Sequence, residues 1–349
     1  MKKEDLRIIF MGTPEFAVGT LSRLVDGGYN VVAVVTQPDK PVGRHQDTLQ
    51  PSEVKQYAVA HDIPVLQPVK MKDPAFVETL RSYRADLQVV VAFRMLPEVV
   101  WAMPRFGTFN VHAALLPQYR GAAPINWAVI NGETETGVTT FFLDKDIDTG
   151  RIILQKRFPI PDDANVEYVY DGLMRLGADI AIETIDRILD GDGEVDSLPQ
   201  DDLAKATVLR PAPKIFKETC EIRWDQPAKQ VYDFIRGLSP YPGAWTTIRL
   251  QGKDLVLKIY GAKKTGEATT AVPGSATAAN GPTAVPGTAS AADGPSAIPG
   301  TVRADRKHLC VACADAWLEL TLLQLAGKKR MAAADFLNGT RGLDEAVCH

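Results

Sequence analysis

In the first half of the chain, short apolar runs alternate with longer segments in which apolar residues recur at helical spacing. This pattern predicts strands at 7–11, 31–36, 87–92, 108–112, 137–143 and 152–158. It predicts helices at 14–26, 51–61, 74–84, 97–103 and 166–189. The strands are apolar without alternation, which is typical of strands that are buried on both faces. We therefore expect an α/β domain over 1–190, built on a doubly wound, mainly parallel sheet.

The second half has a different pattern. Residues 191–213 are polar and carry Gly and Pro, so we interpret them as a linker. Strand-like runs follow at 245–250, 255–260 and 317–325. They predict a small β-rich domain over 214–349.

A low-complexity tract interrupts this second domain at about 265–300. From residue 270 the sequence reads TAVPGSATAANGP, then TAVPGTASAADGP, then SAIPGT, which is a repeat with a period of 13. Two copies and a fragment rich in Ala, Gly and Pro cannot bury a core. We interpret the tract as an expanded connecting loop without chemistry of its own.

Composition narrows the class of protein. With 45% hydrophobic and 23% charged residues, the chain of 349 residues is ordinary for a two-domain globular protein. It has no apolar run long enough to span a bilayer, and its N-terminus lacks the apolar region of a signal peptide. Four cysteines do not make a disulfide framework in a chain of this length. We expect a cytoplasmic protein with no membrane partner.

Charge is divided unevenly along the chain. Residues 1–202 hold 20 Lys and Arg against 30 Asp and Glu, whereas residues 203–349 hold 19 against 13. An acidic body with a basic second domain suggests that the second domain faces a polyanion. Surface charges that are unevenly distributed but bind no partner would give the same counts, so charge alone does not decide between a polyanion-binding domain and an ordinary surface.

Candidate chemistry gathers at the predicted strand 108–112. Asn110 and His112 stand two residues apart, so both side chains leave the same face of an extended strand. Ligand sites in open α/β sheets lie at the carboxyl ends of strands. An amide and an imidazole together can stabilise an oxyanion and move a proton, and Asp148 in a later turn can orient the imidazole. A hydrogen-bonded histidine beside a simple Asp-initiated turn is the plainer reading of the same residues.

The residues around Asn110 and His112 favour the catalytic interpretation. NVHAALLPQYRGAAPI at 110–125, followed by DIDTG at 146–150, resembles the folate-dependent formyltransferase family. The usual family motif is Asn-x-His, Ser-Leu-Leu-Pro, an aromatic residue, Arg-Gly-Ala, and later Asp-Thr-Gly. Further strings are similar to the methionyl-tRNA branch: IIFMGTPEFA at 8–17, VTQPDKPVGR at 35–44 and LLQLAGKKRM at 322–331.

The resemblance implies transfer of a formyl group from 10-formyltetrahydrofolate to the amino group of methionyl-initiator tRNA, without a metal. Asn110, His112 and Asp148 match the family's catalytic triad. Asn110 and protonated His112 are then expected to stabilise the oxyanion that forms when the amine attacks. Asp148 is expected to hold His112 and to help remove the proton of the amine.

The resemblance also implies two segments that contact the folate. These candidates are Ala114, Leu115, Leu116 and Pro117 in one segment, and Phe93, Met95 and Leu96 in the other. The chain departs from the family in both. Ala114 stands where the family usually has Ser, and the string AFRMLP at 92–97 is shorter than usual, with Arg94 in the glycine region.

For tRNA, the resemblance implies two binding regions. The long connection 37–51 matches a loop that enters the acceptor stem, with Arg44 as its basic residue, although a long loop can also be plain surface. The second domain resembles the family's C-terminal OB-like β-barrel, and OB folds commonly bind nucleic acid. The candidates for phosphate contacts there and in the preceding linker are Lys214, Lys217, Lys328, Lys329 and Arg330.

Other signals are weaker. Cys310-x-x-Cys313 lacks the second pair that a zinc site needs. Gly12-Thr13-Pro14 lacks the spacing and the Lys of a nucleotide site, so we expect neither NAD nor ATP. The rival functions are a formyltransferase with another acceptor, a hydrolase that releases formate from formylfolate, and a non-catalytic tRNA-binding protein. We expect a monomer.

Overall fold

The computed structural model of the protein describes residues 1–42, 48–205, 208–269 and 297–349. The chain forms two compact units. Unit 1 comprises Met1–Ala128 and Glu133–Lys214, and unit 2 comprises Val129–Gly132 and Ile215–His349. Arg44 and most of the repeat tract lie outside the described residues.

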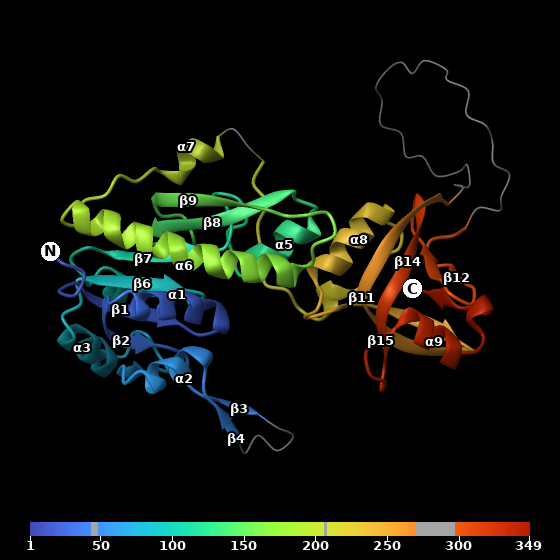
Figure 1. Cartoon of the computed structure of the whole chain (residues 1–349), viewed down its shortest axis with the longest axis horizontal. Coiled ribbons are helices and arrows are strands. Elements are labelled where there is room, and N and C mark those ends of the chain that lie inside the picture. Colours follow the sequence, from blue (N-terminus) through green and yellow to red (C-terminus); the bar gives the residue numbers. More distant parts are fainter. Residues whose placement is uncertain (43–47, 206–207, 270–296) are drawn as a thin grey trace, which may run out of the picture. The chain divides into compact units, whose positions relative to one another are not determined.

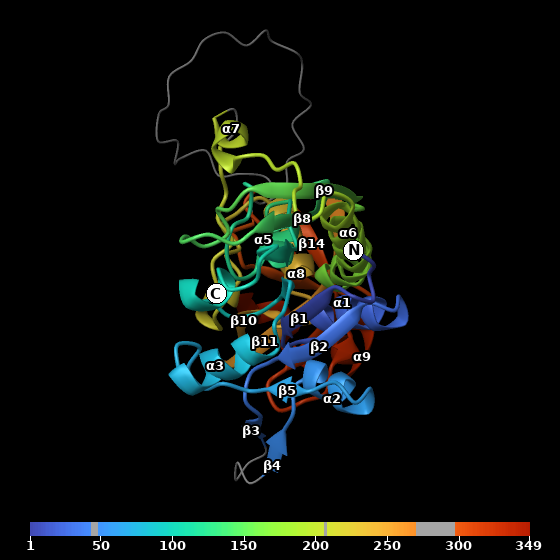
Figure 2. The same ribbon diagram turned by 90° about the vertical axis from the view of Figure 1, so that its left-hand side faces the viewer.

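Unit 1 is built on a seven-stranded sheet with the order β5-β2-β1-β6-β7-β8-β9 (Figure 1; β5 is labelled in Figure 2). The strands are β1 (Arg7–Gly12), β2 (Asn30–Val35), β5 (Val65–Leu66), β6 (Leu87–Val91), β7 (Thr108–His112), β8 (Glu135–Phe142) and β9 (Ile152–Pro159). The strands from β5 to β7 pair in parallel, whereas β8 and β9 are antiparallel to their neighbours. The prediction of a mainly parallel sheet is confirmed.

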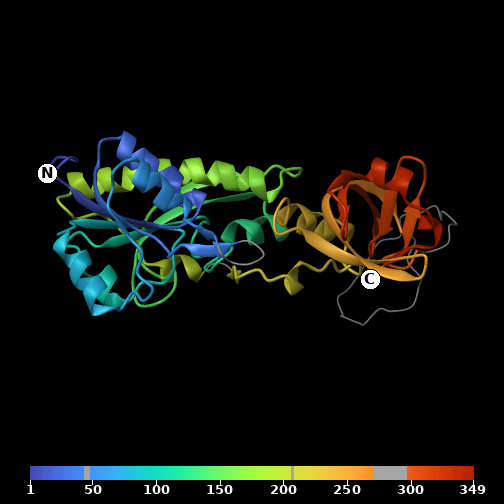
Figure 3. The same ribbon diagram turned by 90° about the horizontal axis from the view of Figure 1, so that it is seen from below.

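Helices cover both faces of this sheet. The helices in this part of the chain are α1 (Glu15–Asp26), α2 (Glu53–Ala60), α3 (Pro74–Ser82), α4 (Glu98–Trp101), α5 (Pro124–Ile130), α6 (Val166–Asp190) and α7 (Gln200–Ala204), and the last two residues of α5 belong to unit 2. Helices α1 and α6 lie side by side on one face, and α3 lies on the other (Figures 2 and 3). Ile9 and Met11 of β1 pack with Val77 and Leu80 of α3. Because β1 is covered on both faces, its apolar residues do not alternate with polar ones.

Local signals explain where the helices of unit 1 begin. Asp73 caps α3 by accepting a hydrogen bond from the Ala75 amide, and Pro74 occupies the first turn, where no amide donor is needed. Asn165 caps α6 in the same way, by accepting from the Tyr168 amide. Among the described helices, none is long and apolar enough to cross a membrane.

Two segments that the sequence suggested were irregular have structure of their own. In the connection 37–51, β3 (Lys40–Val42) pairs with β4 (Thr48–Gln50) in antiparallel register. The segment interpreted as a linker, 191–213, contains α7 and belongs to unit 1.

Unit 2 is an antiparallel sheet of order β12-β13-β14-β11-β10-β16, with β15 paired to β14. Its strands are β10 (Ala244–Leu250), β11 (Lys253–Ala268), β12 (Val302–Ala304), β13 (Leu309–Ala312), β14 (Ala316–Leu325), β15 (Met331–Ala332) and β16 (Val347–Cys348). A bridge between Thr301, beside β12, and Val347 of β16 brings the two edges together, so the barrel is nearly closed. Helices α8 (Ala228–Gly237) and α9 (Ala333–Gly339) contribute to its core.

Candidate active site

Asn110 and His112 lie in β7, near the middle of the unit 1 sheet. In parallel register, Asn110 is opposite Val90 of β6, and in antiparallel register His112 is opposite Thr139 of β8. The imidazole of His112 is only 6% exposed and meets the ring of Phe141 edge-on, with centroids 6.4 Å apart. The candidate catalytic histidine is therefore held at the carboxyl end of a buried strand, where open α/β sheets bind ligands.

The two ring nitrogens of His112 have different neighbours. Nε2 lies 2.8 Å from the carbonyl oxygen of Tyr119, and because a carbonyl oxygen only accepts, Nε2 carries a proton. Nδ1 faces the carboxylate of Asp148, with 3.9 Å between Nδ1 and Oδ2. The same carboxylate oxygen accepts a hydrogen bond of 3.0 Å from the Gly121 amide. Nδ1 is therefore the ring position that faces a carboxylate oxygen held by the backbone.

Asn110 has an unused hydrogen-bonding group. Its side-chain oxygen Oδ1 is buried and has no hydrogen-bond partner among the described residues. Leaving a buried acceptor unpaired costs about 1–3 kcal/mol. Such a group at the end of a strand that also carries His112 is a natural contact for a bound substrate.

The turn that carries Asp148 is tightly fixed. Asp148 adopts a left-handed conformation with φ of 56°, which is uncommon for a residue with a side chain. Thr149 donates a hydrogen bond of 2.7 Å to the carboxylate of Asp144. A Cβ added to Gly150 would lie 1.6 Å from the carbonyl oxygen of Phe142, so only glycine fits there. The glycine of the Asp-Thr-Gly string is thus required by the backbone geometry of this turn, and the threonine links the turn to Asp144.

The first of the two predicted folate segments, residues 114–117, is held by hydrogen bonds from β8 and β9. Ala114, Leu116 and Pro117 are buried. Thr139 Oγ1 donates to the Ala114 carbonyl (2.6 Å) and accepts from the Leu116 amide (3.1 Å). Gln155 Nε2 donates to the Leu116 carbonyl at 2.7 Å. Sequence reasoning missed Thr139 and Gln155, because only the pairing of β8 and β9 brings them under this segment.

The second predicted segment borders a cavity of about 500 Å³. The cavity is lined by Lys70, Met71, Lys72, Met95, Leu96, Pro97, Glu98, Trp101 and Lys145. Met95 and Leu96 were predicted from the sequence, whereas Phe93 is not among the lining residues and packs against the neighbouring core instead. The volume lies within the range of ligand pockets.

Three lysines border this cavity, namely Lys70, Lys72 and Lys145. All three are exposed, and in the described part of the chain their ammonium groups have no hydrogen-bond or ion-pair partner. Lys145 comes from the loop that leads to Asp148. An apolar floor with unpaired cations at its rim suits an aromatic ligand that carries carboxylates.

Arg94, which occupies the family's glycine region, has a structural role. Its guanidinium donates hydrogen bonds to the backbone carbonyls of Val69, at 3.0 Å, and of Pro68. Burial lowers the pKa of this guanidinium. Arg94 therefore fastens the segment immediately before Lys70 to the loop that follows β6.

The candidate tRNA residues that the structure describes are all exposed. Lys328, Lys329 and Arg330 form the turn between β14 and β15, and Arg330 stacks over the ring of Tyr260 at 3.5 Å. Lys217 precedes the first short helix of unit 2, and Lys214 ends unit 1. These residues remain predictions.

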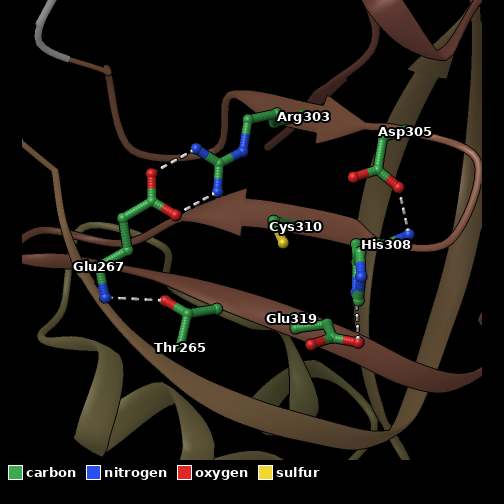
Figure 4. A pocket seen from close by; sticks show the side chains of 7 residues that line it. All are labelled: Thr265, Glu267, Arg303, Asp305, His308, Cys310 and Glu319. Carbon is green, nitrogen blue, oxygen red and sulfur yellow. Dashed lines mark hydrogen bonds and ion pairs between the residues drawn. The ribbon is translucent and has the colours of Figure 1, made fainter.

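Unit 2 contains a second cavity, of about 290 Å³ (Figure 4). Its charges are paired with one another: Arg303 forms two bonds of 2.6 Å with Glu267, and His308 lies 3.2 Å from Glu319. Burial raises the pKa of the Cys310 thiol in its wall, and Cys313 is also a buried free thiol. Within the described ranges, no group of three or more His, Cys, Asp or Glu side chains is placed to hold a metal ion.

Two family models match the chain. Residues 6–185 match the model described as formyl transferase, and residues 214–341 match the formyl transferase C-terminal domain. Together the two matches span most of both units. They leave 186–213, which includes α7, between them.

Three similar proteins carry the same description. A methionyl-tRNA formyltransferase from Parabacteroides distasonis is 58% identical over 99% of both chains. One from Bacteroides fragilis is 56% identical over 97% of this chain and 96% of its own, and one from Flavobacterium johnsoniae is 43% identical over 98% and 99%.

Solved structures share the fold at low identity. HypX from Aquifex aeolicus, solved with tetrahydrofolic acid, has a TM-score of 0.57 at 18% identity, covering 95% of this chain and 46% of its own. WlaRD, a sugar 3N-formyl transferase, has a TM-score of 0.60 at 17% identity, covering 93% and 99%. At such identities the likeness supports the fold.

Proposed function

The chain belongs to the formyl transferase family, in its methionyl-tRNA branch, and we propose that Asn110, His112 and Asp148 carry its reaction. The reaction moves the formyl group of 10-formyltetrahydrofolate to the amino group of methionyl-tRNA, as the similarity at 54–58% identity over nearly the whole chain shows. The observation that supports these three residues is the His112–Asp148 pair, together with the unpartnered oxygen of Asn110, which lies two residues before His112 in β7.

His112 and Asp148 act as an electrostatic pair in this proposal. As the amine attacks, the formyl oxygen gains negative charge, and a positively charged imidazole stabilises it. The Asp148 carboxylate lies beside Nδ1, where it attracts the positive charge of a protonated ring, while the Tyr119 carbonyl fixes the orientation of the ring through Nε2. Asp148 is also the nearby base toward which the proton of the amine can move as the new carbon–nitrogen bond forms. The bond between the formyl carbon and N10 of the folate then breaks, and N10 takes up that proton.

Asn110 completes the centre by hydrogen bonding. Its buried Oδ1 accepts a hydrogen bond from the attacking amine, which satisfies the acceptor left unpaired within the protein. The amide nitrogen of the same side chain can donate to the formyl oxygen. Both contacts place the reacting groups within reach of each other, which lowers the entropic part of the barrier.

For the co-substrate, we propose that the cavity beside Leu96 receives the aryl and glutamyl part of the folate. Met71, Leu96 and Trp101 supply apolar walls. Lys70, Lys72 and Lys145 lie at the rim with no partner in the described structure, so they can pair with glutamyl carboxylates. This arrangement joins the folate to the loop that carries Asp148.

For the acceptor, we propose that the phosphates of the tRNA are held by Lys217 and by the turn Lys328, Lys329 and Arg330, together with Lys214 and Arg44. The described members of this set are exposed cations, and the half of the chain after residue 202 is net positive. We also propose that the enzyme acts as a cytoplasmic monomer. Its solution mass would then be near 38.0 kDa in a light-scattering measurement, and twice that mass would contradict it.

The proposal is tested by formyl transfer to methionyl-initiator tRNA with the wild type, His112→Ala and His61→Ala. His61 is an exposed histidine of the same unit and serves as the matched control. We expect transfer that requires tRNA, is lost in His112→Ala and is retained in His61→Ala. Wild-type rates in His112→Ala would refute the site, and formate release without tRNA would indicate a hydrolase.

A further inference from the structure

The segment after α6 lies against the loops of the candidate site. Leu198 exchanges two backbone hydrogen bonds of 2.8 Å with Ile152, at the start of β9. Further along, the Tyr119 amide donates to the Arg210 carbonyl (2.8 Å), and the Ala212 amide donates to the Arg120 carbonyl (2.9 Å). The segment is thus fastened both beside the Asp148 turn and at the Arg-Gly loop.

Gln200, the first residue of α7, connects these two loops (α7 is labelled in Figure 1). Its side-chain oxygen accepts from Arg120 Nε at 3.0 Å and from Arg120 Nη2 at 2.7 Å. Its side-chain nitrogen donates to the carbonyls of Asp148, at 2.9 Å, and Gly150, at 2.8 Å. The side chain is 2% exposed, and all four of its hydrogen-bonding positions are used.

The Asp148 turn needs such support. A non-glycine residue in the left-handed region persists only where the surrounding structure holds it there. Gln200 binds the carbonyl of Asp148 itself and that of Gly150, so it fixes both sides of the turn. Since the turn aims the carboxylate at His112 Nδ1, the orientation of that carboxylate depends on Gln200.

The Arg120 end of the contact reaches the same catalytic groups. The amide of Gly121 donates to Asp148 Oδ2, and the carbonyl of Tyr119 accepts from His112 Nε2. Both neighbours of Arg120 therefore contact the catalytic pair directly. By holding the Arg120 guanidinium, Gln200 ties this loop to the turn.

Gly121 gives an independent indication that the later segment is part of the site. Its φ is 128°, and an added Cβ would lie 2.4 Å from the carbonyl oxygen of Ala212. The glycine is therefore required by the close approach of the backbone near Ala212, not by the loop alone. The Arg-Gly motif is shaped to receive this segment.

We propose that Gln200 is a positioning residue for formyl transfer, which orients the Asp148 turn and the Arg120 loop as one rigid frame. It does not touch the reacting atoms. It lies between the segments that match the two family models, 6–185 and 214–341. The inference rests on the proposed role of Asp148.

The test compares Gln200→Glu and Gln200→Ala with Asp201→Ala, an exposed neighbour in α7. An ionised Glu has nearly the same shape and still accepts from Arg120, but it cannot donate to the two turn carbonyls. We expect kcat to fall about 10- to 100-fold in both Gln200 variants, the cost of a misplaced catalytic group, while KM for tRNA stays near the wild-type value. Asp201→Ala should keep wild-type kcat. All assays run well below the lowest melting temperature of the set.

Each alternative result has a definite meaning. Wild-type kcat in Gln200→Glu would overturn the proposal, since the turn would then not need its donors. An effect on KM alone, or an equal loss in Asp201→Ala, would also overturn it. His112→Ala is measured in parallel: if it stays active, the proposed catalytic site fails, whichever result Gln200 gives.

Discussion

The imidazole Nδ1 of His112 lies 3.9 Å from a carboxylate oxygen of Asp148. The other ring nitrogen is occupied by the Tyr119 carbonyl, so the ring cannot turn to another partner without losing a buried hydrogen bond. The carboxylate is itself fixed by the Gly121 amide. The orientation of the ring, its burial and its position beside a carboxylate are thus set before a substrate binds, and such preorganisation favours electrostatic catalysis.

Asp148→Asn removes the negative charge of the carboxylate but keeps a side chain of nearly the same shape. The amide can still accept from the Gly121 backbone, but it cannot favour a charged imidazole or take up a proton. We expect kcat to fall by about 10²–10⁴, the usual range for a general acid–base group. Steady-state kinetics measure this, with the exposed Asp146→Asn on the same loop as control. A loss of only a few-fold would exclude Asp148 from the reaction.

The lysine cavity should govern affinity for the folate. In Lys70→Gln/Lys72→Gln/Lys145→Gln, we expect KM for 10-formyltetrahydrofolate to rise about tenfold, with kcat little changed, because a binding interaction common to ground and transition states is lost. The increase should be larger for a co-substrate with several glutamyl residues. Lys253→Gln, an exposed lysine in unit 2, is the control. An unchanged KM with both forms would place the tail elsewhere.

Gly150→Ala should disrupt the turn that carries Asp148 and so lower both stability and activity. Its Cβ would lie 1.6 Å from the Phe142 carbonyl oxygen, so the backbone must move. We expect a loss of about 3 kcal/mol in the free energy of unfolding, at the upper end for overpacking, together with lost activity. Gly339→Ala, where an added Cβ meets nothing within 4 Å, should be nearly neutral. Denaturant unfolding compares the two, and equal stabilities would contradict the geometry.

The basic turn of unit 2 should appear in the salt dependence of tRNA binding. Each phosphate contact releases counterions, so the slope of log affinity against log salt should fall by about 1 for each contacting cation removed. We expect this for Lys328→Gln, Lys329→Gln and Arg330→Gln, measured by binding titrations across a salt series. A wild-type slope in all three variants would show that this turn faces solvent in the complex.

Two buried thiols should make stability depend on alkaline pH. Burial raises the pKa of Cys313, and likewise of Cys348, from 9.0 to about 12. Between those values the folded chain keeps protons that the unfolded chain has released, so this contribution to stability is lost as pH rises through the window. Unfolding measured below pH 9.0 and within the window should show the decline, and Cys313→Ala and Cys348→Ala should weaken it. If the variants lost stability with rising pH as steeply as the wild type, burial of these two thiols would not be the cause of the decline.

The sequence by itself determined much of the catalytic unit. The apolar runs predicted β7 at the bounds that the structure has, because a strand buried on both faces carries its own signal. Asn110 and His112 were identified from a spacing of two on that strand, together with the family resemblance. The mainly parallel sheet, the formyl-transfer reaction and the folate co-substrate are all confirmed.

Only the tertiary structure decided how the site is held. The contacts of Thr139 and Gln155 with the folate segment, and those of Gln200 with two loops, join residues far apart in the chain. The contact between His112 and Tyr119 spans only seven residues, but it depends on how the loop after β7 folds back. The segment of Gln200 is polar and interrupted by Gly and Pro, so its local pattern indicates a linker. The hydrogen bonds of Gln200 depend on which loops the fold brings beside it. The spacing of apolar residues in a sequence shows which face of an element is buried, but it does not show which partner a polar side chain will bind.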